Sequence, residues 1–100
     1  MVLVTAPSAE VAAGLARTLV EERLAACGNV LPEVRSIYRW DGRIHEDAEA
    51  LLVLKTTRAR LDALRDRVLA LHPYAVPELL ALPVEAGSAG YLAWLAGETA

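Results

Sequence analysis

The segment 72–78, with the sequence HPYAVPE, brings an imidazole, a phenol and a carboxylate together within seven residues. Its two prolines fix the backbone between these groups. Such a loop could hold a metal ion or a small ligand through His72, Tyr74 and Glu78. The simpler interpretation is a rigid connection in which His72 caps a preceding helix, where a cation is favoured. The sequence leaves both interpretations open.

Lys55 is the only lysine of the chain and shares a parity with Glu49 on a predicted strand, with Leu51 and Val53 between them. The four side chains therefore share a face. A lysine in an apolar strand needs a counter-charge or an anionic ligand. We predict either a structural ion pair across a subunit interface, with Glu49 or Glu78 as the acid, or a contact with a small anionic metabolite.

Other residues that can ligate metals are few. His45-Glu46-Asp47 lies beside a predicted turn, and because successive strand residues alternate faces, we expect a solvated tip rather than a metal site. Cys27 has no second Cys and no His near it in sequence, which favours a buried structural role. With two His and one Cys, a single chain cannot build a His/Cys structural zinc site. A metal site must use carboxylates or be shared between subunits.

Aromatic residues either line a cleft or anchor an oligomer interface, and the second use is the more common. The five are Tyr38, Trp40, Tyr74, Tyr91 and Trp94. The sequence contains no Ser-His-Asp order, nucleophile elbow, P-loop or dinucleotide fingerprint. We therefore predict that the protein is not an enzyme, and an enzyme with a tyrosine or carboxylate base is the least favoured alternative.

The elements that must position these residues follow from the apolar periodicity. Ser8 is a good N-cap, and Gly28-Asn29 suits the end of the helix that follows. Asp41-Gly42 predicts a type I′ hairpin turn, and His72-Pro73 ends a second helix. The predicted strands are 2–5, 30–40, 43–57 and 76–84, and the predicted helices are 8–26, 58–71 and 91–95, with a loop at 87–90.

The order β-α-β-β-α-β plus a short C-terminal helix predicts an α+β, ferredoxin-like fold with a long central hairpin, as a single domain over 1–100. Two helices then cover one face of an antiparallel sheet. Segments 51–54 and 79–82 are apolar at both parities, so the other face also requires burial. Hydrophobic residues make up 55% of the chain, above the roughly 45–50% of typical soluble domains. We predict that another subunit supplies the second cover.

The charge and composition exclude several classes of protein. The net charge of −3 and the pI of about 5.3 argue against nucleic-acid binding. No apolar run approaches the roughly 18 residues needed to span a bilayer, and the N-terminus lacks the pattern of a signal peptide. We expect a cytoplasmic protein without a membrane partner. The arginine-rich composition fits a thermophile or a GC-rich genome, and the sequence does not separate the two.

Taken together, five segments resemble the CutA family in order and spacing: LAACGNV at 24–30, SIYRWDG at 36–42, LKTT at 54–57, HPYAVPE at 72–78 and YLAWL at 91–95. The resemblance covers nearly the whole chain. It implies a homotrimer, similar in architecture to PII signalling proteins, whose hairpins interlock and whose clefts lie between subunits. The family is associated with divalent-cation tolerance, and some members bind copper.

The resemblance also implies which residues face the intersubunit cleft: Tyr38, Trp40, Glu49, Lys55, His72, Tyr74, Glu78 and Trp94. The proposed copper ligands of the family include a first-strand cysteine and a pair of histidines before the Pro-Tyr. This sequence has Val4-Thr5 and Leu71-His72 at those positions, so His72 alone remains as a metal candidate.

Two hypotheses of different classes follow. The first is a non-enzymatic homotrimer linked to metal homeostasis, which binds a divalent cation such as copper weakly through His72 and carboxylates. The second is a PII-like sensor that holds a small anionic metabolite against Lys55.

Overall fold

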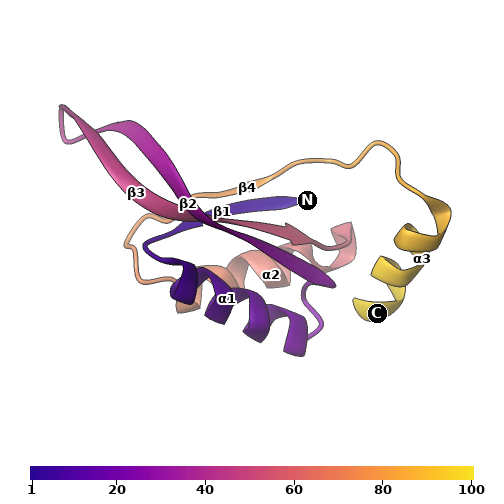
Figure 1. Ribbon diagram of the computed structural model, residues 1–100. Helices are drawn as coiled ribbons and strands as arrows, with labels where there is room; N and C mark the ends of the chain where they lie inside the picture. Colours follow the sequence, from indigo (N-terminus) through magenta and orange to yellow (C-terminus); the bar gives the residue numbers. More distant parts are fainter.

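The computed structural model describes residues 1–100. Its elements are β1 (Val2–Ala6), α1 (Ala9–Glu21), β2 (Cys27–Trp40), β3 (Arg43–Lys55), α2 (Arg58–Leu71), β4 (Leu79–Ala81) and α3 (Ala89–Glu98). The strands form one antiparallel sheet in the order β2-β3-β1-β4, and helices α1 and α2 lie under one of its faces (Figure 1). The predicted α+β, ferredoxin-like fold is confirmed.

The core lies between the sheet and the two covering helices. On β1 and on residues 50–54 of β3 every second side chain is buried, as expected for strands with one covered face. The largest fully buried side chains are Val2, Val4, Leu19, Leu52, Leu54, Leu64 and Val68. Each contributes about 1.5–3 kcal/mol by leaving water.

The hairpin of β2 and β3 is the longest feature of the molecule and projects beyond the helices (Figure 1). Its turn has positive φ at both central residues, 53° at Asp41 and 74° at Gly42. These values agree with the predicted type I′ turn. The register runs from Trp40 opposite Arg43 down to a bulge between Leu31 and Val34.

The end of α1 differs from the prediction of a helix over 8–26. Ser8 caps the helix as expected, accepting a hydrogen bond from the amide of Val11 at 3.2 Å. At the other end, Arg23 adopts a left-handed conformation with φ 59°. The amide of Arg23 then donates to the Val20 carbonyl, and the next amide, that of Leu24, donates to the carbonyl of the residue before Val20. This is a Schellman ending in which arginine occupies the position usually held by glycine.

Gly28 therefore does not terminate the helix; it lies within β2. A Cβ at this position would lie 2.8 Å from the Cβ of Ala16 on α1 and 3.2 Å from a methyl of Leu54. Glycine allows β2 to approach α1 closely, which explains a residue that the sequence suggested was a helix stop.

The C-terminal part of the chain also differs from prediction. Only Leu79–Ala81 of the predicted strand 76–84 pairs with β1. The predicted loop 87–90 is half helix, because α3 begins at Ala89 with Ser88 at its N-cap, and α3 extends to Glu98 rather than ending at residue 95. The end of α3 is tied to the body, where the Arg60 side chain donates to the Thr99 carbonyl at 2.8 Å.

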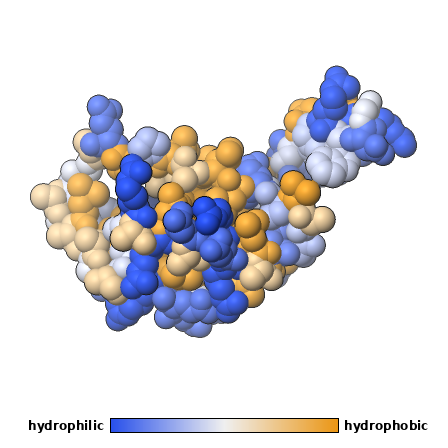
Figure 2. Space-filling view, turned by 180° about the vertical axis from the view of Figure 1, so that it is seen from behind, coloured by the Kyte–Doolittle hydropathy of each residue, from blue (hydrophilic) through white to orange (hydrophobic).

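The sheet face opposite the helices, here called the helix-free face, is apolar and uncovered. Leu3, Leu51 and Val53 are only half-buried there, while Leu31 and Leu80 are 42% and 58% exposed. Seen from behind, the body carries apolar patches with hydrophilic residues between them (Figure 2). The predicted excess of apolar surface on the second face is thus present.

Candidate functional site

A group of polar side chains gathers where the hairpin leaves the body. The Tyr38 hydroxyl of β2 donates a hydrogen bond to the Asp47 carboxylate of β3. This bond is the first cause that raises the pKa of Tyr38 above its ordinary value, and burial is the second. The Tyr38 ring also stacks on His45, with ring centroids 5.4 Å apart.

The second phenol of this group comes from the loop after α2. The Tyr74 hydroxyl donates to Glu49 on β3 at 2.9 Å. Burial, followed by the bond to Glu49 and the charge of Asp47, raises the pKa of Tyr74 to about 12. We call Tyr38, Asp47, Glu49 and Tyr74 the hairpin cluster. Both of its phenols are hydrogen-bond donors at neutral pH.

His72 positions the loop that carries Tyr74. Its ring is buried, and Nε2 lies 2.7 Å from the Thr5 carbonyl oxygen on β1. The other nitrogen, Nδ1, accepts a hydrogen bond from the Tyr74 amide at 3.1 Å. These partners require the neutral tautomer with its proton on Nε2. A metal ion reaches His72 only if one of these two bonds breaks.

The chemistry available to the hairpin cluster follows from its carboxylates. Asp47 and Glu49 are two residues apart on one strand and face the same side. Each accepts one phenol and keeps oxygens free for a hard cation. No group of three or more His, Cys, Asp or Glu side chains is close enough to hold a metal ion. The donors that copper(II) prefers, several imidazoles or a thiolate, do not converge here.

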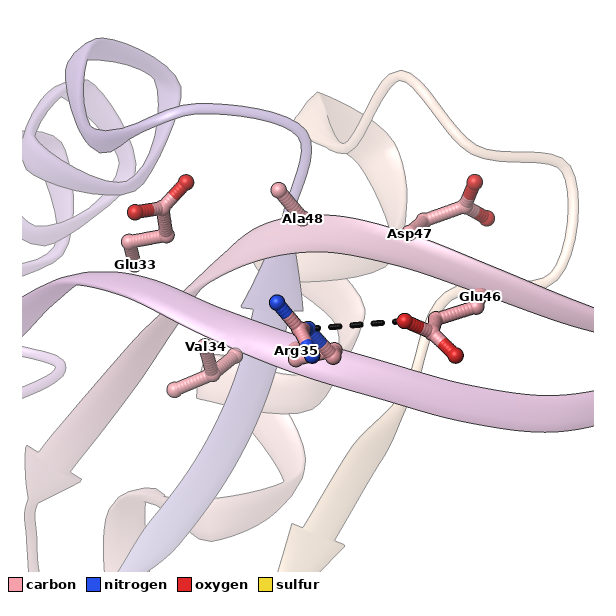
Figure 3. Close-up of a pocket in the computed structure, with 6 residues that line it drawn as sticks. All are labelled: Glu33, Val34, Arg35, Glu46, Asp47 and Ala48. Carbon is pink, nitrogen blue, oxygen red and sulfur yellow. Dashed lines mark ion pairs between the residues drawn. The ribbon is translucent and has the colours of Figure 1, made fainter.

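An open pocket of about 480 Å³ lies on the hairpin at the bulge, next to the hairpin cluster (Figure 3). It is lined by Glu33, Val34, Arg35, Glu46, Asp47 and Ala48. An ion pair between Arg35 and Glu46, 3.5 Å long and exposed, crosses it. Exposed pairs of this kind contribute little to stability, and no donor set in the pocket points to a ligand.

A second polar group, here called the lysine end, lies at the opposite end of the helix-free face. Lys55 ends β3 and lies opposite Cys27, the first residue of β2. The Lys55 Nζ is 4.0 Å from the Cys27 Sγ. Burial first, and the Cys27 thiol second, raise the pKa of Tyr91 on α3 above its ordinary value.

The two ends are too far apart for an ion pair between Lys55 and Glu49 of one chain. Six residues of β3 separate them, about 20 Å at the rise of a strand. Glu78 is also remote from Lys55. It directly precedes Leu79, which lies opposite Val4 on β1. Lys55 directly follows Leu54, which lies opposite Val2 at the start of β1. Within one chain, neither acid neutralises Lys55.

Comparison with known proteins shows the family of this chain. The sequence profile described as "CutA1 divalent ion tolerance protein" matches residues 1–98. The chain is also 54% identical to the divalent-cation tolerance protein CutA of Thermus thermophilus, over 99% of this chain and 96% of that protein. The chain belongs to the CutA1 family.

Relatives within the CutA1 family extend from bacteria to animals. Human protein CutA is 50% identical over 92% of this chain, which spans about half of the human protein. The solved structure of the Thermus thermophilus protein matches with a TM-score of 0.96 at 55% identity, covering 99% and 96% of the two chains. A protein of Nostoc sp. PCC 7120 described as PII-like CutA matches with a TM-score of 0.91 at 36% identity, covering 99% and 95%.

One of the matching structures is described with a cellular location. A matching structure from Archaeoglobus fulgidus, with a TM-score of 0.96 and 34% identity over 99% of this chain and 96% of that one, is described as a periplasmic divalent cation tolerance protein. In the present chain, no helix is both long and apolar enough to cross a membrane.

The residues that the CutA resemblance places in the cleft do not all lie together in one chain. Tyr38, Glu49, His72 and Tyr74 lie together, whereas Lys55 and Trp94 lie at or near the lysine end. Trp94 packs against Tyr91 with ring centroids 5.4 Å apart. Trp40 lies alone at the hairpin tip, 57% exposed, and Glu78 is exposed before β4 without an ion pair.

Sequence reasoning missed the roles of Asp47 and Cys27. Asp47 is exposed, as expected for a solvated position, but it also accepts the Tyr38 hydroxyl, which was not expected. Counting back from the two-residue turn places Asp47 opposite Ser36 and on the face of Tyr38, so the signal was present in the sequence. Cys27 is half-buried rather than fully buried, and its thiol lies 4.0 Å from the ammonium of Lys55.

Proposed function

We propose that the protein works as a non-enzymatic homotrimer of one domain, residues 1–100, in divalent-cation tolerance in the cytoplasm. The apolar helix-free face supports self-association most directly. Leu31 and Leu80 are exposed on it, beside a hairpin that extends past its own helices. A second copy that covers this face removes apolar surface from water. Sedimentation equilibrium tests the assembly, and a stable, folded monomer at micromolar concentration would exclude it.

The raised pKa values of the phenols argue against one enzymatic alternative, a tyrosine acting as general base. A general base works best when its pKa is near the operating pH. The pKa of Tyr74 is about 12, and that of Tyr38 is also raised. Neither phenol is a base at neutral pH, so the tyrosine-base alternative has no support from this cluster.

We propose further that a divalent cation binds weakly at the hairpin cluster, through the free oxygens of Asp47 and Glu49. His72 joins only by releasing Thr5 or Tyr74, so its contribution as a ligand is small unless the loop moves. Two carboxylates without a third protein ligand give low affinity and little selectivity among cations.

Calorimetric titration with copper(II) and with magnesium tests this proposal. We expect weak binding of both ions that Asp47→Asn and Glu49→Gln each reduce, since these amides keep the shape of the side chain and lose its charge. Glu85→Gln, outside the cluster, is the matched control. Nanomolar copper affinity that survives His72→Ala would overturn the proposal.

A second candidate function is a PII-like sensor of a small anion, and the position of Lys55 favours it. The five ion pairs of the chain all use arginine, so Lys55 has no carboxylate partner within its own chain. If a carboxylate of another copy neutralises Lys55, Lys55→Met weakens assembly and costs about 3–5 kcal/mol when the pair is buried. If an exchangeable anion does so, Lys55→Met leaves stability nearly intact and abolishes anion binding.

A further inference from the structure

The hairpin tip holds an aspartate whose surroundings differ from those of the other aspartates in the chain. Asp41 is followed by Gly42 in the turn, and both residues are exposed. The remaining aspartates, Asp47, Asp62 and Asp66, are exposed as well. Access to water therefore does not distinguish Asp41. What distinguishes it is the freedom of its carboxyl group and of the amide that follows it.

The carboxyl group of Asp41 has no partner. It belongs to none of the five ion pairs of the chain, and the hydrogen bonds that side chains donate to aspartates all go elsewhere. Asp47 accepts the hydroxyl of Tyr38. Asp62 and Asp66 both accept from the arginine that lies between them in α2. Only the Asp41 carboxyl is free to turn towards its own backbone.

The amide that follows Asp41 is free as well. The N–H of Gly42 donates to no backbone carbonyl, and a Cβ at this position would meet nothing within 4 Å. The residues that follow the other aspartates are held in regular structure. Ala48 lies inside β3, in register with β2, and residues 63 and 67 lie inside α2, where amides donate to the carbonyl four residues earlier. These three residues also carry a Cβ beside the amide, and glycine does not.

We propose that Asp41 is a site of spontaneous isoaspartate formation. The Gly42 nitrogen attacks the side-chain carbonyl carbon of Asp41 and forms a new C–N bond, while the hydroxyl of the protonated carboxyl leaves with the amide proton as one water molecule. Solvent water then opens the five-membered imide at one of its two carbonyls. Opening at the side-chain carbonyl restores aspartate, and opening at the main-chain carbonyl leaves isoaspartate with a free α-carboxylate. The two steps consume no oxidant, and the water that is released is taken up again.

The position of the turn favours this attack and determines its effect. The backbone of Asp41 must rotate to bring the nitrogen onto the carboxyl, and its left-handed conformation, φ 53°, is one that costs energy for residues with a Cβ. The tip projects beyond the helices (Figure 1), so the rotation displaces no packed core. Isoaspartate adds a methylene to the main chain, which a two-residue type I′ turn does not accommodate. The last pair of the hairpin, Trp40 opposite Arg43, then loses its register.

Peptide mapping of the folded protein during prolonged incubation at mildly acidic pH tests the proposal. Trypsin releases residues 40–43 as one peptide. Isoaspartate in this peptide has the mass of aspartate but a different retention time, and a protease that cleaves before aspartate leaves it intact. We expect isoaspartate to accumulate at Asp41 and to stay at background at Asp47, Asp62 and Asp66. Asp41→Asn is the positive control, because asparagine forms the same imide by losing ammonia and should give the same product sooner.

A parallel incubation in urea shows what the fold contributes. The unfolded chain exposes the same Asp-Gly sequence without the turn. Isoaspartate at residue 41 in urea but not in the folded protein would mean that the turn protects this bond, and would overturn the proposal, as would its absence from both samples. Equal formation at all four aspartates of the folded protein would also contradict it, because the free carboxyl and the free amide would then not select the site.

Discussion

The hydroxyl of Tyr74 donates to the carboxylate of Glu49 across 2.9 Å, although 25 residues separate the two in the chain. The bond ties the proline-rich loop to the base of the hairpin. Because His72 holds the amide of the same tyrosine at 3.1 Å, the loop is fixed from two sides.

This bond predicts a loss of stability at high pH. The pKa of Tyr74 is raised from its ordinary value of about 10 to about 12 in the folded protein. A raised pKa means that the folded state favours the neutral phenol. Its contribution is complete below about pH 10 and is lost as the pH rises through about 12. Because Tyr74 is 37% exposed, solvent screening limits this contribution to about 1 kcal/mol.

Urea unfolding of wild type and Tyr74→Phe at pH 8 and pH 11.5 measures this effect. We expect Tyr74→Phe to be less stable at pH 8 and the difference to shrink at pH 11.5. Tyr38→Phe is the comparison: the pKa of this phenol is raised as well, so its removal should show the same direction of pH dependence, but it does not hold the loop. A Tyr74→Phe difference that stays constant between the two pH values would contradict the assignment.

His72→Ala tests whether this imidazole is structural. The change leaves the Thr5 carbonyl and the Tyr74 amide without their partner in a buried place, which should cost about 2–4 kcal/mol. The loss should be the same in the presence of a chelator. His45→Ala, at the exposed hairpin, should cost less than about 1 kcal/mol. Chemical unfolding at one protein concentration compares them, and an effect seen only when metal is present would instead make His72 a ligand.

Substitution of two glycines by alanine tests the packing of β2 on α1, one at the contact and one away from it. Gly28→Ala places a Cβ 2.8 Å from that of Ala16, and overpacking of this kind should cost about 1–3 kcal/mol. Gly14→Ala meets nothing within 4 Å and lies inside α1, so it should stabilise the protein by up to about 1 kcal/mol. Thermal unfolding measures the change in stability for each variant. Equal changes in the two variants would argue against the close approach of β2 to α1.

Trp40→Ala tests the role of the hairpin tip in assembly. Trp40 is 57% exposed in one chain and lies beyond the reach of its own helices. If it anchors a neighbouring copy, its removal should weaken association by about 2 kcal/mol or more. Sedimentation over a range of concentrations measures this, with Ile44→Ala on the other face of the hairpin for comparison. If the dissociation constant of the assembly is unchanged in Trp40→Ala, the hairpin tip is not part of the interface between copies.

The sequence predicted the elements whose signals are local. The Asp41-Gly42 turn and the helix 58–71 follow from turn chemistry and from the proline that ends the helix, and both agree with the structure. The two-faced apolar strands predicted the uncovered sheet face for the same reason, because alternation is a property of a few successive residues.

Features that depend on contacts between distant elements could not be predicted. Gly28 looked like a helix stop, because its neighbour Ala16 on α1 is recognised only in three dimensions. Arg23 in a left-handed conformation gives no sequence signal, since glycine is the usual residue there. Parity places Lys55 and Glu49 on one face without giving the distance along it, and the separation of about 20 Å along β3 leaves only the predicted ion pair across a subunit interface, which a single chain does not test.

The outer edge of β2 has a consequence for how copies meet. β2 pairs only with β3, so one side of a 14-residue strand presents free amides and carbonyls. Such an edge is a template for pairing with another chain, and repeated pairing that does not close makes fibres. Pro32 lies in the bulge of this strand, where it offers no amide and breaks the run of donors. The edge is therefore divided at the bulge into two shorter runs of free donors and acceptors, which makes it a poorer template for continuous pairing than an unbroken strand of the same length.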